Sequence, residues 1–556
     1  MSKLLESTEV ESLALLIEEA TRSTEEGIKR FIEPGQGTLR RATSKRHHII
    51  FGRRGSGKSS LLRKAAADLT IDRRPIAYVD LEIFKGHSYP NVLLSILIKA
   101  FSEFEEWLQT AAINPAYKTT FWQTLFGTQP KRAPFNRKEA KELASALRSQ
   151  VKHLNHQLQT ADDIETHKIT RNDQEAANQD ETGVQIGTNQ LGISSKLTDT
   201  EKINVSEEVQ EAFHQSKTDF LHRHILEYQD LFHRISKLSG GDAYLFLDDL
   251  YHIRRSDQAK VIDYFHRIAK GNNLWLKIGT IRHRTQWYIH NDPPIGVKLG
   301  DDADDIDLDL TLEKYASAKE FLSKILKSFM DNCGSLSIHQ ILTDGAMERL
   351  VLASGGVARD FLGIFRKAIN VAREREHEAN IRGPKIGVED VNAAAGEYDT
   401  SKREEFRRDT LDDRSQLENE FQRLVTFCTE NVKTNVFLLD KDASGKGIEL
   451  IQELVDLRLV HKVRDRVTVK SGQPGKIFEA YMLDVSQYTG ARKRRGLDII
   501  EFWRHDHSEK LRRTSIIYHP SETDKPNKVY QTAKGTSKVN QTTDGTSPYR
   551  QGELFA

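Results

Sequence analysis

A lysine and a serine follow a glycine-rich stretch near the start of this 556-residue sequence. Residues 52–59, GRRGSGKS, fit the Walker A pattern G-x-x-x-x-G-K-[ST]. In such a loop the backbone N–H groups cradle phosphate oxygens, the lysine reaches the terminal phosphates and the hydroxyl ligates Mg²⁺. We expect Lys58 and Ser59 to take these roles with ATP. The residues expected to hold the nucleotide are Gly52, Arg53, Arg54, Gly55, Ser56, Gly57, Lys58, Ser59 and Ser60.

The residues on either side favour a phosphate site over the alternative, a glycine-rich turn with an unrelated lysine. Residues 48–51 (HIIF) predict a short buried strand, and residues 59–69 predict an amphipathic helix of good helix formers. A turn between such elements points successive N–H groups inward, at the positively polarised start of the helix.

Magnesium opposite Ser59 requires a carboxylate from a second strand. Residues 242–249, DAYLFLDD, form an apolar run typical of central parallel strands and end in two acids. We expect Ser59 and Asp248 to hold the magnesium, Asp248 directly or through water, and Asp249 to orient the attacking water. The alternative for Asp249 is a cap on the following turn.

The order of these segments resembles that of the AAA+ and related STAND ATPases, most closely the branch with the origin-recognition ATPases. The resemblance spans roughly residues 31–394 and includes residues 75–81 (PIAYVDL) and 274–280 (LWLKIGT). It implies that Thr280 is the sensor 1 residue that contacts the terminal phosphate; the alternative is an ordinary strand-end threonine. Many such ATPases carry glutamate at the position of Asp249, and the shorter aspartate implies slow hydrolysis, which suits a switch.

A further arginine comes from residues 352–360, LASGGVARD, which lie between two helical stretches and resemble the sensor 2 segment of that family. The resemblance implies that Arg359 reaches the nucleotide from a helical lid; the alternative is an ion pair with a surface acid. Arg282 and Arg284 are either arginine fingers toward a neighbouring subunit of a homo-oligomer or surface arginines. The expected catalytic set is Asp248, Asp249, Thr280 and Arg359.

Residues 89–241 form an insert far longer than an ordinary connection. Its first part is apolar at helical spacing and is expected to pack on the sheet. The cluster at 121–127 (FWQTLFG) either docks a partner or lipid surface or covers the core of the insert. A flexible hairpin is expected around residues 184–193, and one long helix is expected over residues 207–238. Residues 306–312 alternate as a last strand before the lid, so their acids form a solvated face.

Residues 435–503 resemble a winged helix, with a strand, a helix, a hairpin and a Gly-Pro wing in order. The helix before such a hairpin usually enters the major groove of DNA, but here it is rich in acids. We therefore expect the wing and residues 491–496, ARKRRG, to contact the phosphates of DNA. The alternative is a protein-docking module. The expected DNA-contacting cations are Lys462, Arg464, Arg466, Lys470, Lys476 and Arg492–Arg495.

The final residues, QGELFA, follow a polar segment that we expect to be disordered. Gln551, Leu554 and Phe555 resemble the short peptides by which bacterial replication and repair proteins bind the sliding clamp, where an apolar pair fills a pocket. The alternative is an ordinary polar tail.

Composition limits the cellular setting. The 82 basic and 81 acidic residues leave a net charge of +1, so any nucleic-acid surface must be a local patch. Two cysteines, Cys333 and Cys428, agree with a reducing compartment. The apolar run at residues 13–20 lacks the features of a signal peptide, and no transmembrane segment is evident. We expect a cytoplasmic protein without a membrane partner.

The predicted fold class is an α/β P-loop NTPase with a parallel sheet, a large mostly helical insert, a helical lid, a C-terminal winged-helix domain and a disordered tail. The predicted function is that of an ATP-binding, slowly hydrolysing switch associated with DNA. The alternative is a STAND-like signalling ATPase, in anti-phage defence for example, with a separate effector. The expected divisions are an N-terminal helix (1–30), the ATPase core (31–310), the lid (311–400), a helical linker (401–434), the winged helix (435–503) and the tail (504–556).

Overall fold

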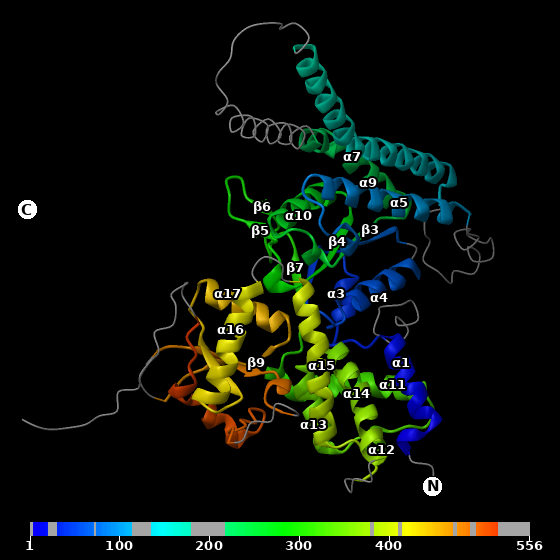
Figure 1. Ribbon diagram of the computed structural model, residues 1–556. Coiled ribbons are helices and arrows are strands. Elements are labelled where there is room, and N and C mark those ends of the chain that lie inside the picture. Colours follow the sequence, from blue (N-terminus) through cyan, green and yellow to red (C-terminus); the bar gives the residue numbers. More distant parts are fainter. Residues whose placement is uncertain are drawn as a thin grey trace, which may run out of the picture.

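A five-stranded parallel sheet forms the centre of residues 31–310 in the computed structural model (Figure 1). Helices cover both faces of this sheet, and two further groups of elements lie beside it. The structure describes residues 4–20, 31–71, 74–113, 135–179, 217–377, 383–409, 414–470, 475–489 and 496–520.

The strand order of the central sheet decides which side chains meet. The order is β2-β3-β4-β1-β7, and all neighbouring pairs are parallel. All carboxyl ends therefore lie at one edge, and β4 separates the strand before the glycine-rich loop from the strand that ends in Asp248. The bounds are β1 His48–Phe51, β2 Ile76–Asp80, β3 Ala243–Asp248, β4 Leu274–Thr280 and β7 Asp304–Asp307; β5 Tyr288–Ile289 and β6 Ile295–Gly296 form a separate small hairpin.

Side chains of β1 alternate between the two faces of the sheet, as the pleat requires. Ile49 and Phe51 pack with the helices of one layer, whereas Ile50 packs with Leu61 and Leu62 of the opposite layer. The first layer contains α5 Asn91–Ile113, α9 Ile225–Leu238 and α10 Arg255–Ala269, and the second contains α3 Thr38–Ala42 and α4 Lys58–Ile71.

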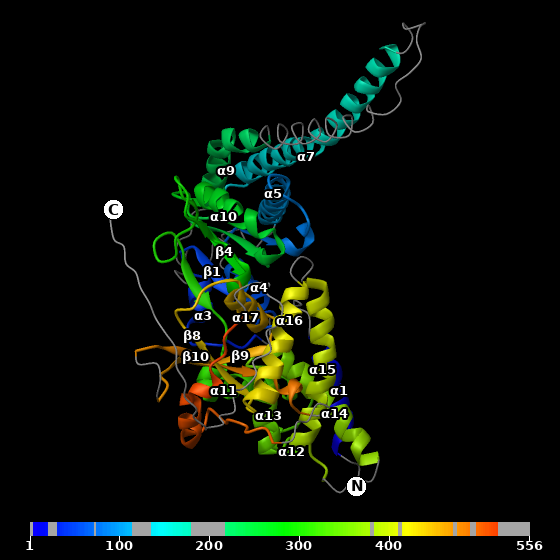
Figure 2. The same ribbon diagram turned by 60° about the vertical axis from the view of Figure 1, so that its left-hand side comes forward.

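The insert is largely helical. The expected packing of its first part on the sheet is confirmed, because α5 shares a core with β2 and β3. The helix α7, Arg137–Gln179, runs away from the body of the chain (Figure 2). The prediction of one long helix over residues 207–238 is wrong within its described part, because a turn at His224 separates helical residues 217–223 from α9. The cluster at 121–127 and the hairpin around 184–193 lie outside the described residues.

The lid shares its core with the N-terminal helix, which is therefore not a separate unit. Val10, Leu13 and Ile17 are buried against lid helices. The predicted strand over residues 306–312 ends early, at Asp307, because the Asp307 carboxylate accepts a hydrogen bond of 2.9 Å from the Asp309 N–H and turns the chain. The elements are η1 Leu4–Glu6, α1 Thr8–Glu19, η6 Leu312–Lys314, α11 Tyr315–Met330, α12 Ile338–Ile341, α13 Asp344–Ser354, α14 Ala358–His377 and α15 Val388–Asp409.

Residues 414–520, here named the C-terminal module, contain a three-stranded antiparallel sheet in the order β8-β10-β9. The helix follows β8 as predicted, but the hairpin predicted before the wing is wrong, because residues 460–467 form the single strand β9, which pairs with β10. The winged-helix assignment stays a prediction. The elements are α16 Arg414–Thr426, the π-helical turn η7 Phe427–Asn431, β8 Val436–Asp440, α17 Lys446–Asp456, β9 Val460–Val467, β10 Phe478–Leu483, η8 Val485–Gln487, η10 His505–Arg512 and η11 Thr514–Ile516.

The start of the predicted tail is folded, so the boundary at residue 504 is wrong. Leu511 and Ile516 are buried, and the N–H of Tyr518 donates to the Leu438 carbonyl at 2.8 Å. The Tyr518 hydroxyl also donates to Glu420 at 2.7 Å. These contacts attach residues up to 520 to the C-terminal module, whereas the clamp-like Gln551, Leu554 and Phe555 lie outside the described residues. Within the described ranges, every helix is too short or too polar to cross a membrane.

Candidate nucleotide-binding site

The glycine-rich loop adopts a conformation that its glycines make accessible. Gly55 and Gly57 have φ angles of +85° and +98°, in the region that side chains disfavour. Gly52 has a different reason to be glycine, because a Cβ there would lie 2.3 Å from the Ser56 hydroxyl oxygen. The loop leads directly into α4, whose first residue is Lys58. It therefore places N–H groups at the start of a helix, where an anion is favoured.

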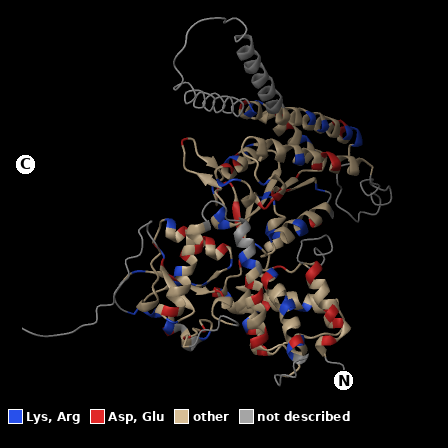
Figure 3. Cartoon of the chain, viewed as in Figure 1, with Lys and Arg blue, Asp and Glu red and all other residues tan. Residues whose placement is uncertain are grey.

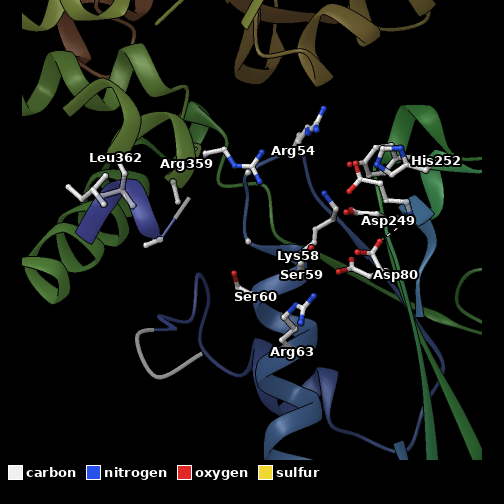
Figure 4. A pocket seen from close by; sticks show the side chains of 18 residues that line it. Arg54, Lys58, Ser59, Ser60, Arg63, Asp80, Asp249, His252, Arg359 and Leu362 are labelled. Carbon is white, nitrogen blue, oxygen red and sulfur yellow. Dashed lines mark hydrogen bonds between the residues drawn. The ribbon is translucent and has the colours of Figure 1, made fainter. Parts of the chain in front are cut away.

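A cavity of about 780 Å³ lies in front of this loop (Figure 4). Five chain segments that are distant in sequence converge on it: the end of α1, the loop with the start of α4, the carboxyl end of β2, the carboxyl end of β3 and the start of lid helix α14. Its lining carries cations suited to phosphate and carboxylates suited to a metal ion. The cations are Arg54, Lys58, Arg63 and Arg359, and the carboxylates are Asp80, Glu82, Asp248 and Asp249.

Lys58 is held at the base of the cavity by the loop itself. Its Nζ donates to the carbonyl oxygens of Gly52 at 2.9 Å and Arg53 at 3.3 Å, and lies 5.6 Å from the centre of the Tyr251 ring. Burial lowers the pKa of Lys58, and the nearby carboxylate of Asp249 opposes this shift. A phosphate oxygen would replace neutral carbonyls with a charged acceptor, which forms the stronger hydrogen bond.

Asp248 is almost completely buried, with 3% of the residue's surface exposed. Tyr78 Oη donates to Oδ2 of this carboxylate at 2.5 Å. Burial and the neighbouring Asp249 raise the pKa of Asp248 to about 6, while the hydrogen bonds from Tyr78 and Ser59 lower it. The other oxygen, Oδ1, is buried and has no hydrogen-bond partner among the described residues.

Ser59 and Asp248 therefore fit the predicted magnesium role. Both residues line the cavity, the Ser59 hydroxyl lowers the pKa of Asp248, and Asp248 Oδ1 has no hydrogen-bond partner among the described residues. No group of three or more Asp, Glu, His or Cys side chains in the described part of the chain is arranged to bind a metal alone. Magnesium would depend on water and nucleotide phosphates for its remaining ligands, as it commonly does.

Asp249 occupies a left-handed backbone conformation, with φ +57° and ψ +46°. It stands at the N-cap position of η4, Leu250–His252, but its side chain makes no capping hydrogen bond. The capping alternative is therefore not supported, and the carboxylate lines the cavity instead. Burial raises the pKa of Asp249, Lys58 lowers it, and the charges of Asp80 and Glu82 raise it further.

Arg359 and Thr280 differ in their placement. Arg359 lines the cavity, and its backbone N–H donates to the Gly55 carbonyl at 3.3 Å. The alternative of a surface ion pair finds no partner for Arg359 among the described residues. Thr280 is fully buried, and its hydroxyl is 2.5 Å from that of Thr285 rather than at the cavity. The geometry therefore brings Arg359 to the site, whereas the sensor role of Thr280 stays a prediction.

The two arginines considered as fingers have partners within the chain. Arg282 contacts Asp305 at 2.8 Å and Asp307 at 3.4 Å, and its guanidinium lies 4.0 Å from the centre of the Phe51 ring. Arg284 is electrostatically coupled to Asp456 of the C-terminal module. Both side chains thus face their own subunit in this arrangement.

A smaller cavity of about 130 Å³ adjoins the loop and shares Gly57 and Ser60 with the first cavity. Ser56 and Gly57 form one wall, and the rest is mainly apolar, from the segment after α1 and from α11. Such a lining suits the base of a nucleotide whose phosphates lie at the loop. The apolar residues include Phe31, Ile32, Leu308, Phe321, Ile325 and Phe329.

Several lining residues were missed by sequence reasoning. Asp80 had a detectable signal, because it ends an apolar run that pairs in parallel register with the strand ending in Asp248. Glu82 follows it in η2, Leu81–Phe84. Tyr251 and His252 belong to the turn after Asp249 and had no pattern that distinguished them. Arg63 lies one turn beyond Ser59 on α4, on the same side of the helix.

The site is connected to the C-terminal module through buried charges. Arg458 donates to Asp360 Oδ1 at 2.6 Å and more weakly to the Arg54 carbonyl at 3.4 Å. Lys402 of α15 contacts both Asp360 at 3.3 Å and Asp484 at 3.0 Å. These four charged side chains are at most 4% exposed. Since Asp360 follows Arg359, the same network reaches the loop, the lid and the module.

A second contact joins the loop to the lid. The Arg53 side chain turns away from the cavity, contacts Asp309 at 3.3 Å and donates to the Gly355 carbonyl at 3.0 Å. Asp456 of α17 lies in the same region, where burial and Asp309 raise its pKa to about 8. The acidic end of the helix expected to face DNA is thus turned toward Arg53 and Asp309, beside the glycine-rich loop.

Three of the five described cations expected to contact DNA are already paired with acids of the C-terminal module. Lys462 contacts Asp465 and Glu479, and Lys476 contacts Asp440. Lys470 is paired with Glu509. Basic and acidic residues accordingly alternate over the module (Figure 3). Arg464 and Arg466 have no such pair in the described ranges, and Arg492–Arg495 lie outside those ranges.

Comparison with models of protein families gave no match, and comparison with curated proteins gave none either. A search of solved structures found a similarity to the ORC1 protein of Aeropyrum pernix in complex with DNA. The identity is 13%, the match covers 85% of this chain and 93% of that chain, and the TM-score is 0.35. A likeness of this degree does not establish a shared function.

Proposed function

We propose that this chain binds ATP with magnesium, hydrolyses it slowly and uses its occupancy to set the position of the C-terminal module. The observation that carries the proposal is the convergence of Lys58, Asp248 and Arg359 on one cavity from three separate segments. The loop N–H groups and Lys58 would bind the phosphates, and Ser59 and Asp248 would hold magnesium, which neutralises phosphate charge. Asp249 would orient the attacking water.

The switch component rests on the buried network behind the site. Arg54 and Gly55 line the cavity, the carbonyl of Arg54 accepts from Arg458, and the carbonyl of Gly55 accepts from the Arg359 N–H. A phosphate held by this loop changes the charge next to both contacts. Buried ion pairs are poor sources of net stability, and fixing one arrangement against another is their best-attested use.

Association with DNA remains part of the proposal, with signalling as its alternative. The pairing of the module's lysines shifts the expected DNA contact toward Arg464, Arg466 and Arg492–Arg495. ATP hydrolysis measured with and without duplex and single-stranded DNA separates the two functions. Stimulation by DNA supports the first, and a rate indifferent to DNA favours the signalling alternative.

ATP binding is tested with a fluorescent ATP analogue in the presence of magnesium. Lys58→Ala should abolish binding, since it removes the ammonium group that meets the phosphates. Lys64→Ala is the matched control, because Lys64 lies on the same helix and pairs with Asp68 at 2.8 Å outside the cavity. Equal affinity of the two variants would refute the assignment of the loop.

A further inference from the structure

Tyr78 forms a short hydrogen bond with the carboxylate expected to serve magnesium. It lies in the middle of β2, and its hydroxyl donates to Asp248 Oδ2 at 2.5 Å. The two residues are 170 positions apart in sequence and meet because β2 and β3 are neighbouring parallel strands.

The Tyr78 ring is held from two sides. It stacks on Phe246, the residue opposite it on β3, with ring centres 6.0 Å apart and planes inclined by 18°. The Arg63 guanidinium lies 5.0 Å from the ring centre on the side of α4. A ring fixed in this way presents its hydroxyl at one place, so the hydrogen bond fixes the carboxylate as well.

The bond makes the two oxygens of Asp248 unequal. Oδ2 is occupied by Tyr78, while Oδ1 is buried without a partner among the described residues. Gly279 of β4 leaves room for this orientation, because a Cβ there would lie 2.8 Å from Oδ1. Without the hydroxyl, the carboxylate could rotate and exchange its oxygens.

We propose that Tyr78 is a positioning residue that holds Asp248 with Oδ1 available to the magnesium of bound ATP. The inference rests on the proposed ATP site and adds a residue to it. Tyr78 acts through Asp248 and touches neither the nucleotide nor the metal.

The test is Tyr78→Phe, which keeps the ring between Phe246 and Arg63 and removes only the hydroxyl. Binding of the fluorescent ATP analogue is measured over a magnesium series and in EDTA. The magnesium concentration for half-maximal enhancement of binding should rise about tenfold, the effect of one hydrogen bond to a charged group. Affinity in EDTA and the binding level at saturating magnesium should stay at wild-type values.

Tyr244→Phe provides the matched control. Tyr244 lies on β3, and its hydroxyl donates to the Thr43 carbonyl at 3.2 Å, so its loss should leave the magnesium series unchanged. An unaltered magnesium requirement in Tyr78→Phe overturns the inference. So does an equal loss of affinity with and without magnesium, which would indicate a general structural role. If wild type binds no ATP, the proposed function fails as well, whereas the two preceding outcomes leave it intact.

Discussion

Arg458 of the C-terminal module and Asp360 of the lid form a buried ion pair, with 2.6 Å between Nη1 and Oδ1 and side-chain exposures of 4% and 0%. Asp360 follows directly after Arg359, which lines the cavity. Burial raises the pKa of Asp360, but the charges of Arg458 and Lys402 outweigh this and leave it below its usual value. The start of α14 is therefore fixed by a charge that belongs to the module.

Arg458→Met should release the module from the lid, because among the described residues Lys402 is then the one buried cation that still contacts Asp360. Removing one member of a buried pair typically costs about 3–5 kcal/mol. We expect faster hydrogen exchange in the first turn of α14 and in β9, and a larger radius of gyration by small-angle scattering. Arg464→Met, a cation on β9 without a described partner, is the control. Wild-type exchange in Arg458→Met would show that the pair does not hold the module.

Gly355→Ala also tests how the C-terminal module docks on the lid, here by a steric clash and not by the loss of a charge. Gly355 ends α13 with a φ of +58°, and a Cβ there would lie 2.1 Å from the His461 ring nitrogen Nδ1. His461 cannot move aside easily, since it is buried and its Nε2 lies 3.0 Å from Asp484. We expect weaker docking of β9, measured by hydrogen exchange, and weaker ATP binding, because Arg53 donates to the Gly355 carbonyl.

Gly383→Ala is the control that separates the clash between residue 355 and His461 from the strain of a left-handed backbone. Gly383 has a φ of +84° and nothing within 4 Å of its would-be Cβ, so it carries only the left-handed penalty of roughly 1–2 kcal/mol. Similar exchange and ATP affinity in the two alanine variants would mean that the close approach of Gly355 and His461 has no role in docking.

The sequence contained the parts of the site that local patterns encode. The loop needs glycines, a lysine and a hydroxyl in fixed spacing, and an apolar run ending in Asp248 indicates a strand with its acid at the sheet edge. Asp80, at the end of the apolar run 75–80, carried the same kind of signal but was not assigned to the site. Arg359 was placed through the resemblance of residues 352–360 to a sensor 2 segment, in which glycines precede an arginine of the lid.

Contacts between distant segments had no such local signal. The bond between Tyr78 and Asp248 depends on which strands are neighbours, and the Arg458–Asp360 pair depends on how the module packs. The start of the tail was predicted wrongly for the same reason. Residues 504–520 are polar enough to suggest disorder, but Tyr518 donates hydrogen bonds to Glu420 and to the Leu438 carbonyl, which lie on folded elements. Amino-acid composition does not indicate whether distant segments will offer such hydrogen-bond acceptors.

Asp249→Asn should slow hydrolysis without preventing ATP binding. Asparagine tolerates the left-handed conformation of this position, so the backbone is kept while the charge is lost. Loss of a group that accepts a proton from water typically costs about 10²–10⁴-fold in rate. Phosphate release in single-turnover experiments measures this, with Asp301→Asn on an exposed loop as control. An unchanged rate would transfer the role to Asp80 or Glu82, the other carboxylates of the cavity.

Lys277 provides a test that is independent of nucleotide. It is fully buried in β4, and its Nζ donates to the carbonyls of Ser44 at 2.7 Å and Arg46 at 2.8 Å. The Nζ also lies 3.0 Å from His48 Nδ1, and no carboxylate contacts it among the described residues. Burial lowers the pKa of Lys277 to about 7, compared with the ordinary value of 10.5.

The direction in which stability changes with pH follows from the number of protons that the folded and unfolded chains bind. Between pH 7 and 10.5 an unfolded chain binds a proton at this lysine that the folded chain has released, so stability rises with pH across this window. Below pH 7 Lys277 is protonated in both the folded and the unfolded chain, so its contribution to the free energy of unfolding no longer changes with pH. The lowered pKa values of His48 and His47, both about 3, affect only the range below their ordinary 6.5. Their contribution is therefore constant where Lys277 titrates.

Lys277→Met should abolish this rise. Relative to the variant, wild type should gain about 1.4 kcal/mol in free energy of unfolding per pH unit at most between pH 7.5 and 9. Urea unfolding at a series of pH values measures the difference, and Lys64→Met, a lysine on the exposed side of α4, should follow the wild-type curve. Parallel curves for wild type and Lys277→Met would mean that the buried lysine keeps its proton, sharing it with the carbonyls of Ser44 and Arg46.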